Sequence, residues 1–93
     1  MNRVPLTVVV ITKNEQDNIG KCLESVYGWA DEIIIVDDES TDRTIEVAKK
    51  FADKIFYKKM DNEGRHRNWS YAQAKNEWVL SLDADEYATE ELK

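Results

Sequence analysis

Three polar clusters in this 93-residue sequence hold the side chains best suited to chemistry, and each directly follows an apolar run. The clusters are Thr12-Lys13-Asn14-Glu15, Asp37-Asp38-Glu39-Ser40 and Asp83-Ala84-Asp85-Glu86. In the third, two carboxylates separated by one residue leave a strand, and such a pair can offer oxygens to a hard divalent cation and to a ligand hydroxyl. That cation can in turn hold a diphosphate. An acidic turn that caps the strand or starts another helix is the alternative.

The acidic pair Asp37-Asp38 is placed like the acidic residue that ends a Rossmann-type strand and holds a ribose or a base. An Asx turn with a helix cap is the other interpretation, and Ser40 and Asp42 suit that task. The two interpretations are compatible if each aspartate has one role. No Gly-x-Gly-x-x-Gly or Walker A sequence is present, which argues against a dinucleotide dehydrogenase and against a P-loop enzyme.

Basic residues near these clusters are candidates for binding a phosphate. Lys13, Arg65 and Arg67 are the nearest, although simple solvation is the alternative for each. We expect His66, at the polar start of a helix, to be exposed rather than to act as a catalytic base.

Two other residue types are expected to serve the core. Cys22 lies on an apolar helix face and should be inert. Trp69 and Trp78 should be core residues, and Trp29 can lie either in the core or at the surface.

Short apolar runs and amphipathic stretches alternate along the chain. The runs predict strands at 8–11, 33–36, 54–57 and 78–82. The first helix should end at Gly28 and bury Ile19, Cys22, Leu23, Val26 and Tyr27. The second helix should follow an N-cap cluster at Ser40-Thr41-Asp42 and bury Ile45, Val47, Ala48, Phe51 and Ala52. The third helix should run from Arg65 to Lys75 after a turn at Glu63-Gly64, with Trp69, Ala72 and Gln73 on one side. This βαβαβαβ order predicts a Rossmann-like, three-layer α/β/α fold with a mainly parallel sheet and ligands at the carboxyl ends of its strands.

Composition limits the possible functions. With 42% hydrophobic and 34% charged residues, the chain has the make-up of one small soluble domain. A net charge of −6 argues against nucleic-acid binding, which needs a basic surface. A single cysteine and a single histidine exclude an internal disulfide and a Cys- or His-rich metal site, and favour a reducing, cytosolic setting. The apolar stretch 6–11 is too short for a signal peptide or a membrane span.

The motifs together resemble family 2 glycosyltransferases of the GT-A fold, over nearly the whole chain. The matching segments are Val-Val-Ile-Thr-Lys-Asn-Glu, Ile-Ile-Ile-Val-Asp-Asp-Glu-Ser-Thr-Asp, Arg67-Asn68 and Glu-Trp-Val-Leu-Ser-Leu-Asp-Ala-Asp-Glu. The residues around 30–32 and 82–86 look closest to bacterial enzymes of the lipopolysaccharide-core type. Ser70 stands where the family has glycine, and Asn76-Glu77 replaces its Gly-Glu pair.

The resemblance implies roles for individual residues. Those expected at the nucleotide-sugar are Thr12, Asn14, Glu15, Asp37, Asp38, Arg67 and Asp83. Asp38 matches the carboxylate that reads the base, and Asp83 matches a residue near the ribose. Asp85, with Asp83, matches the Asp-x-Asp ligand of a divalent cation, Mn²⁺ or Mg²⁺, that bridges the diphosphate. The donor is expected to be a UDP-sugar.

The implied reaction is inverting transfer of a sugar to an acceptor hydroxyl, sugar or lipid-linked, in bacterial cell-surface polysaccharide or lipopolysaccharide synthesis. The catalytic base is expected beyond residue 93, so that residues 1–93 form the donor-binding part without the acceptor site. We further expect a cytoplasmic location, which can be peripheral on the inner face of the bacterial membrane, and a homodimer through an exposed sheet edge. A non-catalytic nucleotide-binding or regulatory module is the alternative. Nucleotidyl transfer ranks last, because the first cluster lacks a glycine-rich loop.

Overall fold

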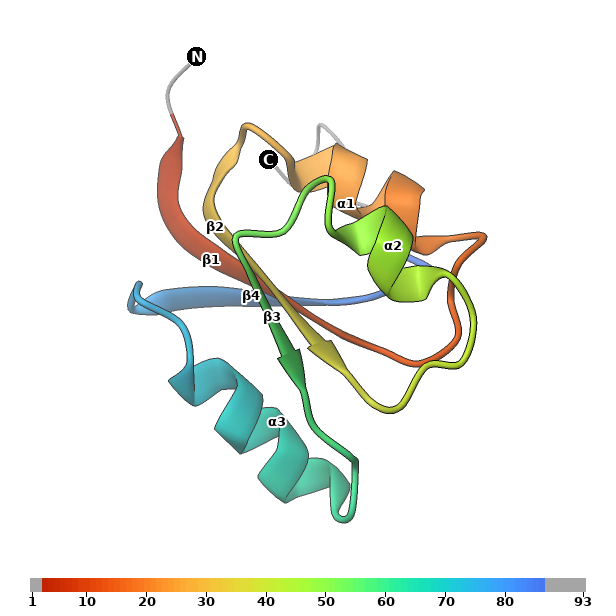
Figure 1. Ribbon diagram of the computed structural model, residues 1–93. Coiled ribbons are helices and arrows are strands. Elements are labelled where there is room, and N and C mark those ends of the chain that lie inside the picture. The colour runs from red at the N-terminus through yellow and green to blue at the C-terminus, as the bar shows by residue number, and fades with distance from the viewer. Residues whose placement is uncertain (1–2, 87–93) are drawn as a thin grey trace.

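The computed structural model describes residues 3–86, in which four strands alternate with three helices (Figure 1). In chain order the elements are β1 (Val4–Thr12), α1 (Ile19–Val26), β2 (Ala30–Asp37), α2 (Thr44–Ala48), β3 (Lys54–Tyr57), α3 (Glu63–Ala72) and β4 (Trp78–Asp83). The predicted βαβαβαβ order is confirmed.

All four strands are parallel and form one sheet in the order β3-β2-β1-β4. Ile11 of β1 lies opposite Val36 of β2 on one side and Asp83 of β4 on the other. The strand order reverses between β1 and β4, because β2 and β3 extend the sheet in one direction and β4 extends it in the other. In open α/β sheets, ligands bind beyond the carboxyl ends of the strands at such a reversal.

Helices cover both faces of the sheet, which makes three layers (Figure 1): α1 and α2 lie on one face and α3 on the other. The core under α1 and α2 contains Val8, Val10, Ile19, Cys22, Leu23, Val26, Ala30, Ile33, Ile35, Ala48, Leu82 and Ala84. The core under α3 contains Val9, Ile34 and Val36, with Ile11, Phe56, Trp69, Tyr71, Ala74 and Val79 partly buried around them. Successive side chains of a strand point to opposite faces, so the part of a strand that is covered on both sides must be apolar, as residues 8–11 of β1 and 33–36 of β2 are.

The first helix ends one residue earlier than its apolar spacing predicts. Ile19, Cys22, Leu23 and Val26 are buried as expected, but Tyr27 is exposed. Tyr27 has already left the helical conformation (φ −63°, ψ 130°), and Gly28 then adopts a positive φ of 82° that L side chains rarely accept. The chain therefore turns toward β2 before the tyrosine can reach the core.

The other two helices also differ in length from the sequence expectation. In α2 only Thr44 and Ala48 are buried, and Ile45, Val47, Phe51 and Ala52 are partly buried against the same core. In α3 the predicted turn at Glu63-Gly64 is wrong, because these residues form the first helical turn. The Asn62 side chain accepts a hydrogen bond from the backbone N–H of Arg65 at 3.1 Å, which caps the helix two residues earlier than predicted.

The three tryptophans have different surroundings. Trp29 packs against the core under α1 and α2, and Trp69 packs edge-to-face on Phe56 with ring centroids 5.5 Å apart. The prediction that Trp78 is a core residue is wrong, since its side chain is 72% exposed. It is the first residue of β4, which within residues 3–86 pairs with β1 alone and so forms an edge of the sheet.

At the amino-terminal end of the sheet, the carboxylate of Glu32 on β2 is almost fully buried. Its Oε2 lies 2.8 Å from Nζ of Lys54, and its Oε1 accepts hydrogen bonds from Thr7 Oγ1 at 2.8 Å and from the backbone N–H of Lys75 at 2.9 Å. These contacts join the α3–β4 connection to the first three strands, which fixes where β4 begins.

None of the helices within residues 3–86 is sufficiently long and apolar to cross a membrane.

Candidate functional site

The three polar clusters meet at the carboxyl edge of the sheet, on the three adjacent strands β2, β1 and β4. Thr12 at the end of β1 lies opposite Asp37 of β2, and Ile11 lies opposite Asp83 of β4. The pairing continues one residue beyond β2, where the backbone N–H of Asp38 donates to the Thr12 carbonyl at 2.9 Å. The structure thus brings together residues that are about 25 and 70 positions apart in the chain, as the parallel strand order requires.

The loop after β1 is hydrogen-bonded to the loop after β2 in both directions. Asn14 donates its backbone N–H to Ser40 Oγ at 2.9 Å and accepts with Oδ1 from the backbone N–H of Thr41 at 2.7 Å. Further bonds run from Glu15 N–H to Thr44 Oγ1 at 2.8 Å, from Gln16 N–H to Asp42 Oδ2 at 3.3 Å, and from Arg43 N–H to Gln16 Oε1 at 3.0 Å. Asn14 has a positive φ of 52°, a conformation that asparagine tolerates better than most residues. The two loops therefore form one unit.

Asp37 and Asp38 have separate roles. Asp37 is buried, and its carboxylate accepts from the backbone N–H of Ser40 at 3.0 Å and from Ser40 Oγ at 2.6 Å. The Asx turn is thus made by Asp37 itself, while Asp42 accepts from the N–H of Thr44 at 2.9 Å at the start of α2. Asp38 is partly exposed, and its Oδ1 accepts from the backbone N–H of Met60 at 2.9 Å. Asp38 is therefore the carboxylate of the pair with access to a ligand.

Thr12 carries a polar group without a partner. Its side chain is only 3% exposed, and Oγ1 makes no hydrogen bond to any residue in 3–86. Buried hydroxyl groups are nearly always hydrogen-bonded in folded proteins, so each exception needs an explanation. A ligand at this edge would supply the missing partner.

The Asp-x-Asp segment forms a tight turn at the end of β4. The backbone N–H of Glu86 donates to the Asp83 carbonyl at 2.9 Å, and the N–H of Asp83 donates to Glu86 Oε1 at 2.8 Å. Ala84 is buried, whereas Asp83 and Asp85 are exposed. The turn therefore presents both aspartates to solvent and holds them by the buried alanine between them.

The electrostatic effect of this turn reaches the neighbouring helix. Burial raises the pKa of the Cys22 thiol to about 12, and the negative charges of Glu86, Asp85 and Asp83 contribute in the same direction. Cys22 is buried as predicted, and its Sγ lies 3.6 Å from the Asp83 carbonyl. Glu86, Asp85 and Asp83 therefore lie close enough to Cys22 to disfavour its thiolate form.

Helix α3 carries Arg67, which interacts with two residues of its own helix. Its Nη2 is 3.3 Å from Glu63 Oε1, and hydrogen bonds with Tyr71 and with Glu63 raise the pKa of Arg67. Tyr71 is also hydrogen-bonded to Ser81, an interaction that lowers the pKa of Tyr71. Ser81 and Asp83 share one face of β4. Tyr71 thus connects Arg67 with the strand that carries the aspartates.

Tyr71 and Ser81 were not identified from the sequence. The available signal was the i, i+4 spacing of Arg67 and Tyr71 on a helix and the i, i+2 spacing of Ser81 and Asp83 on a strand. The other basic candidates, Lys13 and Arg65, are exposed.

The expectation that His66 is exposed is wrong. Its side chain is 1% exposed, and Nε2 lies 2.8 Å from the Lys58 carbonyl oxygen. The polar neighbours of His66 in the sequence suggested a surface position, but His66 and Ser70 lie one turn apart on the buried face of α3.

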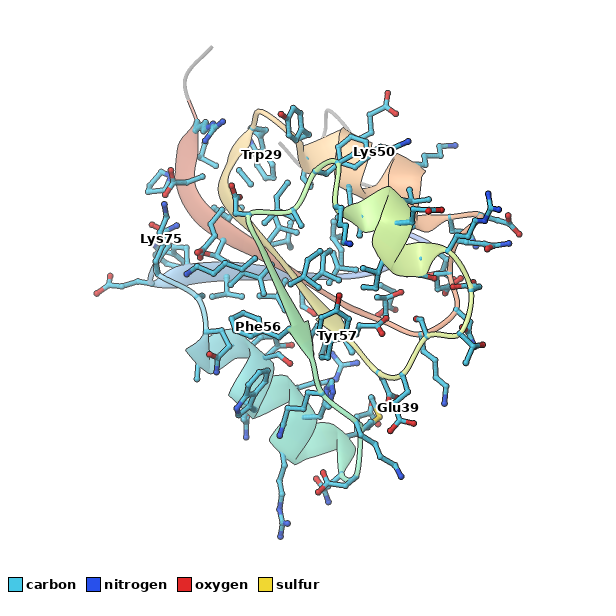
Figure 2. The ribbon with its side chains drawn as sticks, in the orientation of Figure 1. Trp29, Glu39, Lys50, Phe56, Tyr57 and Lys75 are labelled. Carbon is cyan, nitrogen blue, oxygen red and sulfur yellow. The ribbon has the colours of Figure 1, made fainter. Side chains whose placement is uncertain are left out.

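An open pocket of about 510 Å³ lies beside the acidic end of β2, on the side of α2. It is lined by Asp37, Glu39, Ser40, Asp42, Ile45, Tyr57, Lys58 and Lys59. Figure 2 labels two of these lining residues, Tyr57 at the end of β3 and Glu39 in the loop after β2. Because both carboxylates and lysines line this pocket, its charge does not favour an anionic ligand over a cationic one.

The fold and the clustered motifs define a Rossmann-like α/β domain with its acidic residues at the switch point of the sheet. The chain belongs to glycosyl transferase family 2, whose family model matches residues 7–93.

Individual relatives support this membership. The chain is 36% identical over 88 residues to an uncharacterized glycosyltransferase of Rickettsia typhi, covering 95% of this chain and 30% of the relative. It is 38% identical over 91 residues to the prophage-derived glycosyltransferase SunS of Bacillus subtilis, covering 95% of this chain and 22% of that protein. The chain thus spans less than a third of the length of these relatives.

Among solved structures, the chain is similar to glucosyl-3-phosphoglycerate synthase of Mycobacterium tuberculosis in complex with Mn²⁺, UDP and glucosyl-3-phosphoglycerate. The TM-score is 0.73 with 21% sequence identity, over 88% of this chain and 35% of the synthase. This similarity supports the predicted α/β fold.

Proposed function

We propose that this chain is the nucleotide-sugar-binding part of a glycosyltransferase that moves a sugar, with inversion, from a nucleotide diphosphate sugar to an acceptor hydroxyl. The observation that carries the proposal is the meeting of Thr12, Asp38 and the Asp83–Asp85 turn on adjacent strand ends at the switch point. Family membership supports the same conclusion.

The ends of β1 and β2 are suited to bind the nucleoside. Asp38 can accept a hydrogen bond from a base N–H, and the unpartnered Thr12 hydroxyl can bond to the base or ribose. Asn14 and Glu15 shape the loop around the nucleoside through their bonds to the loop after β2. Asp37 acts indirectly, because it holds the turn that contains Asp38 and Ser40.

The end of β4 is suited to a divalent cation and a diphosphate. Within residues 3–86 no group of three or more His, Cys, Asp or Glu side chains could hold a metal ion, so the protein would supply Asp85 with Asp83 and the diphosphate and water the remaining oxygens. This donor set fits Mg²⁺ or Mn²⁺, which keep several non-protein ligands in such sites. When bound, the cation neutralises charge on the leaving diphosphate.

Arg67 would assist at the same diphosphate. Its hydrogen bonds to Glu63 and Tyr71 restrain the guanidinium, and Tyr71 in turn is hydrogen-bonded to Ser81 of β4. The Mycobacterium tuberculosis synthase of similar fold contains both Mn²⁺ and UDP, which supports a cation and a UDP-sugar donor here.

The acceptor site and the general base are proposed to lie outside these 93 residues, since the relatives are more than three times as long. By itself this part would bind donor and would not transfer the sugar. The resemblance to lipopolysaccharide-core enzymes supports an acceptor in bacterial cell-surface polysaccharide synthesis, at the cytoplasmic side of the membrane. The edge strand β4 would then pair with further chain or with a second copy of this chain.

Calorimetric titration with UDP, with and without Mn²⁺, tests the proposal. We expect binding that needs Mn²⁺, is abolished by EDTA, and weakens at least about tenfold in Asp85→Asn, because one cation ligand loses its charge. Glu24→Gln is the matched control, since it removes one exposed carboxylate of α1 that belongs to none of the three polar clusters. Equal UDP affinities of wild type and Asp85→Asn, or a UDP affinity that is the same with and without Mn²⁺, would contradict the metal site.

A further inference from the structure

His66 is a buried polar residue that the proposed donor site does not use. The only polar contact of its ring within residues 3–86 is between Nε2 and the Lys58 carbonyl, at 2.8 Å. Because a carbonyl oxygen can only accept, Nε2 carries the proton and donates it. Nδ1 is buried and makes no hydrogen bond in the same part of the chain. An apolar side chain would avoid this unpartnered nitrogen but would leave the Lys58 carbonyl without its donor.

Through this bond, His66 closes the loop between β3 and α3. The ring donates to Lys58 at the start of the loop, and the His66 backbone N–H donates to the Asn62 carbonyl at its end, at 2.9 Å. The Lys58 ammonium also lies 4.9 Å from the centroid of the Trp69 ring, one turn further along α3. Segment 58–62 is therefore held against α3 at both ends.

The same loop orients the Asp38 carboxylate. Lys58 donates its backbone N–H to the Asp37 carbonyl at 2.9 Å, and Met60 donates its backbone N–H to Asp38 Oδ1 at 2.9 Å. Met60 thus binds one oxygen of a partly exposed carboxylate, which leaves Asp38 Oδ2 available to a ligand. The direction of Oδ2 depends on where Met60 lies, and the position of Met60 depends on the loop that His66 closes.

We propose that His66 is a positioning residue for nucleobase recognition: it holds loop 58–62 so that Met60 fixes Asp38 with one oxygen turned toward the base. This inference rests on the proposed donor site. A carboxylate held this way accepts a hydrogen bond from a uracil-type ring N–H, whereas the corresponding ring nitrogen of cytosine is an acceptor and would be repelled. Asp38 in this position therefore favours a uridine nucleotide over a cytidine nucleotide.

The first test needs no ligand and measures amide hydrogen exchange of the 93-residue chain by NMR. His66→Phe and the shorter His66→Asn both lose the donor to Lys58, so Met60 should exchange at least about tenfold faster relative to core amides of β1 and β2. His66→Gln can place an amide N–H near the position of Nε2 and should restore slow exchange. Ser70→Ala is the matched control, because it removes a buried hydrogen bond to the His66 carbonyl at 2.7 Å but leaves the Lys58 contact.

The second test compares the affinities for UDP and CDP in the presence of Mn²⁺. The UDP preference of the wild type should fall about tenfold in His66→Asn and in Asp38→Asn, and should stay within about twofold in His66→Gln and Ser70→Ala. A role in stability alone would change the two affinities together and leave their ratio intact. Unchanged Met60 exchange in His66→Asn, or a preference lost in Asp38→Asn and kept in His66→Asn, would overturn the inference. Absence of UDP binding in the wild type would instead contradict the donor site, and the Met60 exchange would still decide whether His66 holds the loop.

Discussion

Oδ1 of Asn14 lies 2.7 Å from the backbone nitrogen of Thr41, and this hydrogen bond joins two loops that are 27 residues apart in the chain. In the opposite direction, the backbone N–H of Asn14 donates a hydrogen bond to Ser40 Oγ. Together the two bonds hold the loop after β1 against the loop after β2. The sequence placed both segments at a ligand edge, and the structure shows that each holds the other in position.

We expect Asn14→Gly to lower the free energy of unfolding by about 1 kcal/mol, because the acceptor for the Thr41 N–H is lost while the positive φ is kept. Asn14→Ala should lower the free energy of unfolding by about 1 kcal/mol more than Asn14→Gly does, since alanine disfavours the left-handed conformation. Urea denaturation of the two variants measures both effects. Equal losses in the two variants would show that the backbone conformation of residue 14 has no part in stability.

Glu32→Gln is expected to lower the free energy of unfolding by about 2 kcal/mol at pH 7. The amide cannot pair with Lys54 as the carboxylate does, although the half-exposed lysine can turn to water and limit the loss. Urea denaturation measures the change. Glu24→Gln, which alters an exposed carboxyl of α1, should change stability by less than about 0.5 kcal/mol.

The pH dependence of stability gives a second measurement on Glu32. Burial opposes ionisation of this carboxyl, but hydrogen bonds from Lys54, from the Lys75 N–H and from Thr7 outweigh it and hold the pKa below its ordinary 4.5. The resulting stabilisation is present above that ordinary value and is lost as the pH falls through the lower pKa of the folded state. Wild type should therefore lose more stability than Glu32→Gln between pH 7 and about pH 3. Parallel curves for the two proteins would argue against ionised Glu32 as the cause.

Trp78→Ala and Trp69→Ala form a matched pair. Replacing the exposed Trp78 should lower the free energy of unfolding by less than about 1 kcal/mol. Replacing Trp69 should lower it by about 2–3 kcal/mol, because the Trp69 ring packs on Phe56 and lies under the Lys58 ammonium. Thermal or urea unfolding of both variants gives the comparison. A larger loss for Trp78 would mean that this ring is covered in solution, for example by a second chain paired along β4.

The Cys22 thiol should resist aromatic disulfide reagents at about pH 8, because the thiolate is the reactive form and burial raises the pKa of this thiol to about 12. Reaction is expected only after the protein unfolds in urea. Glu24→Cys is the control, since it adds an exposed thiol two residues away that should react at once. The neutral thiol favours the folded state, a contribution that is complete below the ordinary pKa of 9.0 and is lost as the pH rises toward about 12. Fast labelling of native Cys22 would contradict its burial.

Much of the site could be predicted from local patterns. The apolar runs that end at Thr12, Asp37 and Asp83 identified three strands, and the parallel order implied that their polar ends meet. Local patterns could not predict which of the adjacent aspartates, Asp37 or Asp38, stabilises the turn and which remains available to a ligand. Asp37 points to Ser40 and Asp38 to Met60 because successive residues leave a strand on opposite sides, and their partners come from different loops.

The sequence-based predictions that were wrong concern the burial of individual side chains, which depends on neighbours that are distant in sequence. Trp78 is apolar but begins an edge strand, and its ring is 72% exposed. Tyr27 is apolar but follows the last turn of α1, and its ring packs edge-to-face on Phe51 while the residue stays 58% exposed. His66 has polar neighbours in the sequence, yet it is 1% exposed because it shares the buried face of α3 with Ser70.

The sequence by itself determined the element order, the parallel α/β class and the position of three acidic or polar motifs at strand ends, because apolar periodicity and motif spacing are local properties of the chain. Only the tertiary structure decided which side chains of those motifs remain available to a ligand. That outcome depends on hydrogen bonds between loops such as 13–16 with 40–44 and 58–62 with Asp38, which form only after the strands have aligned.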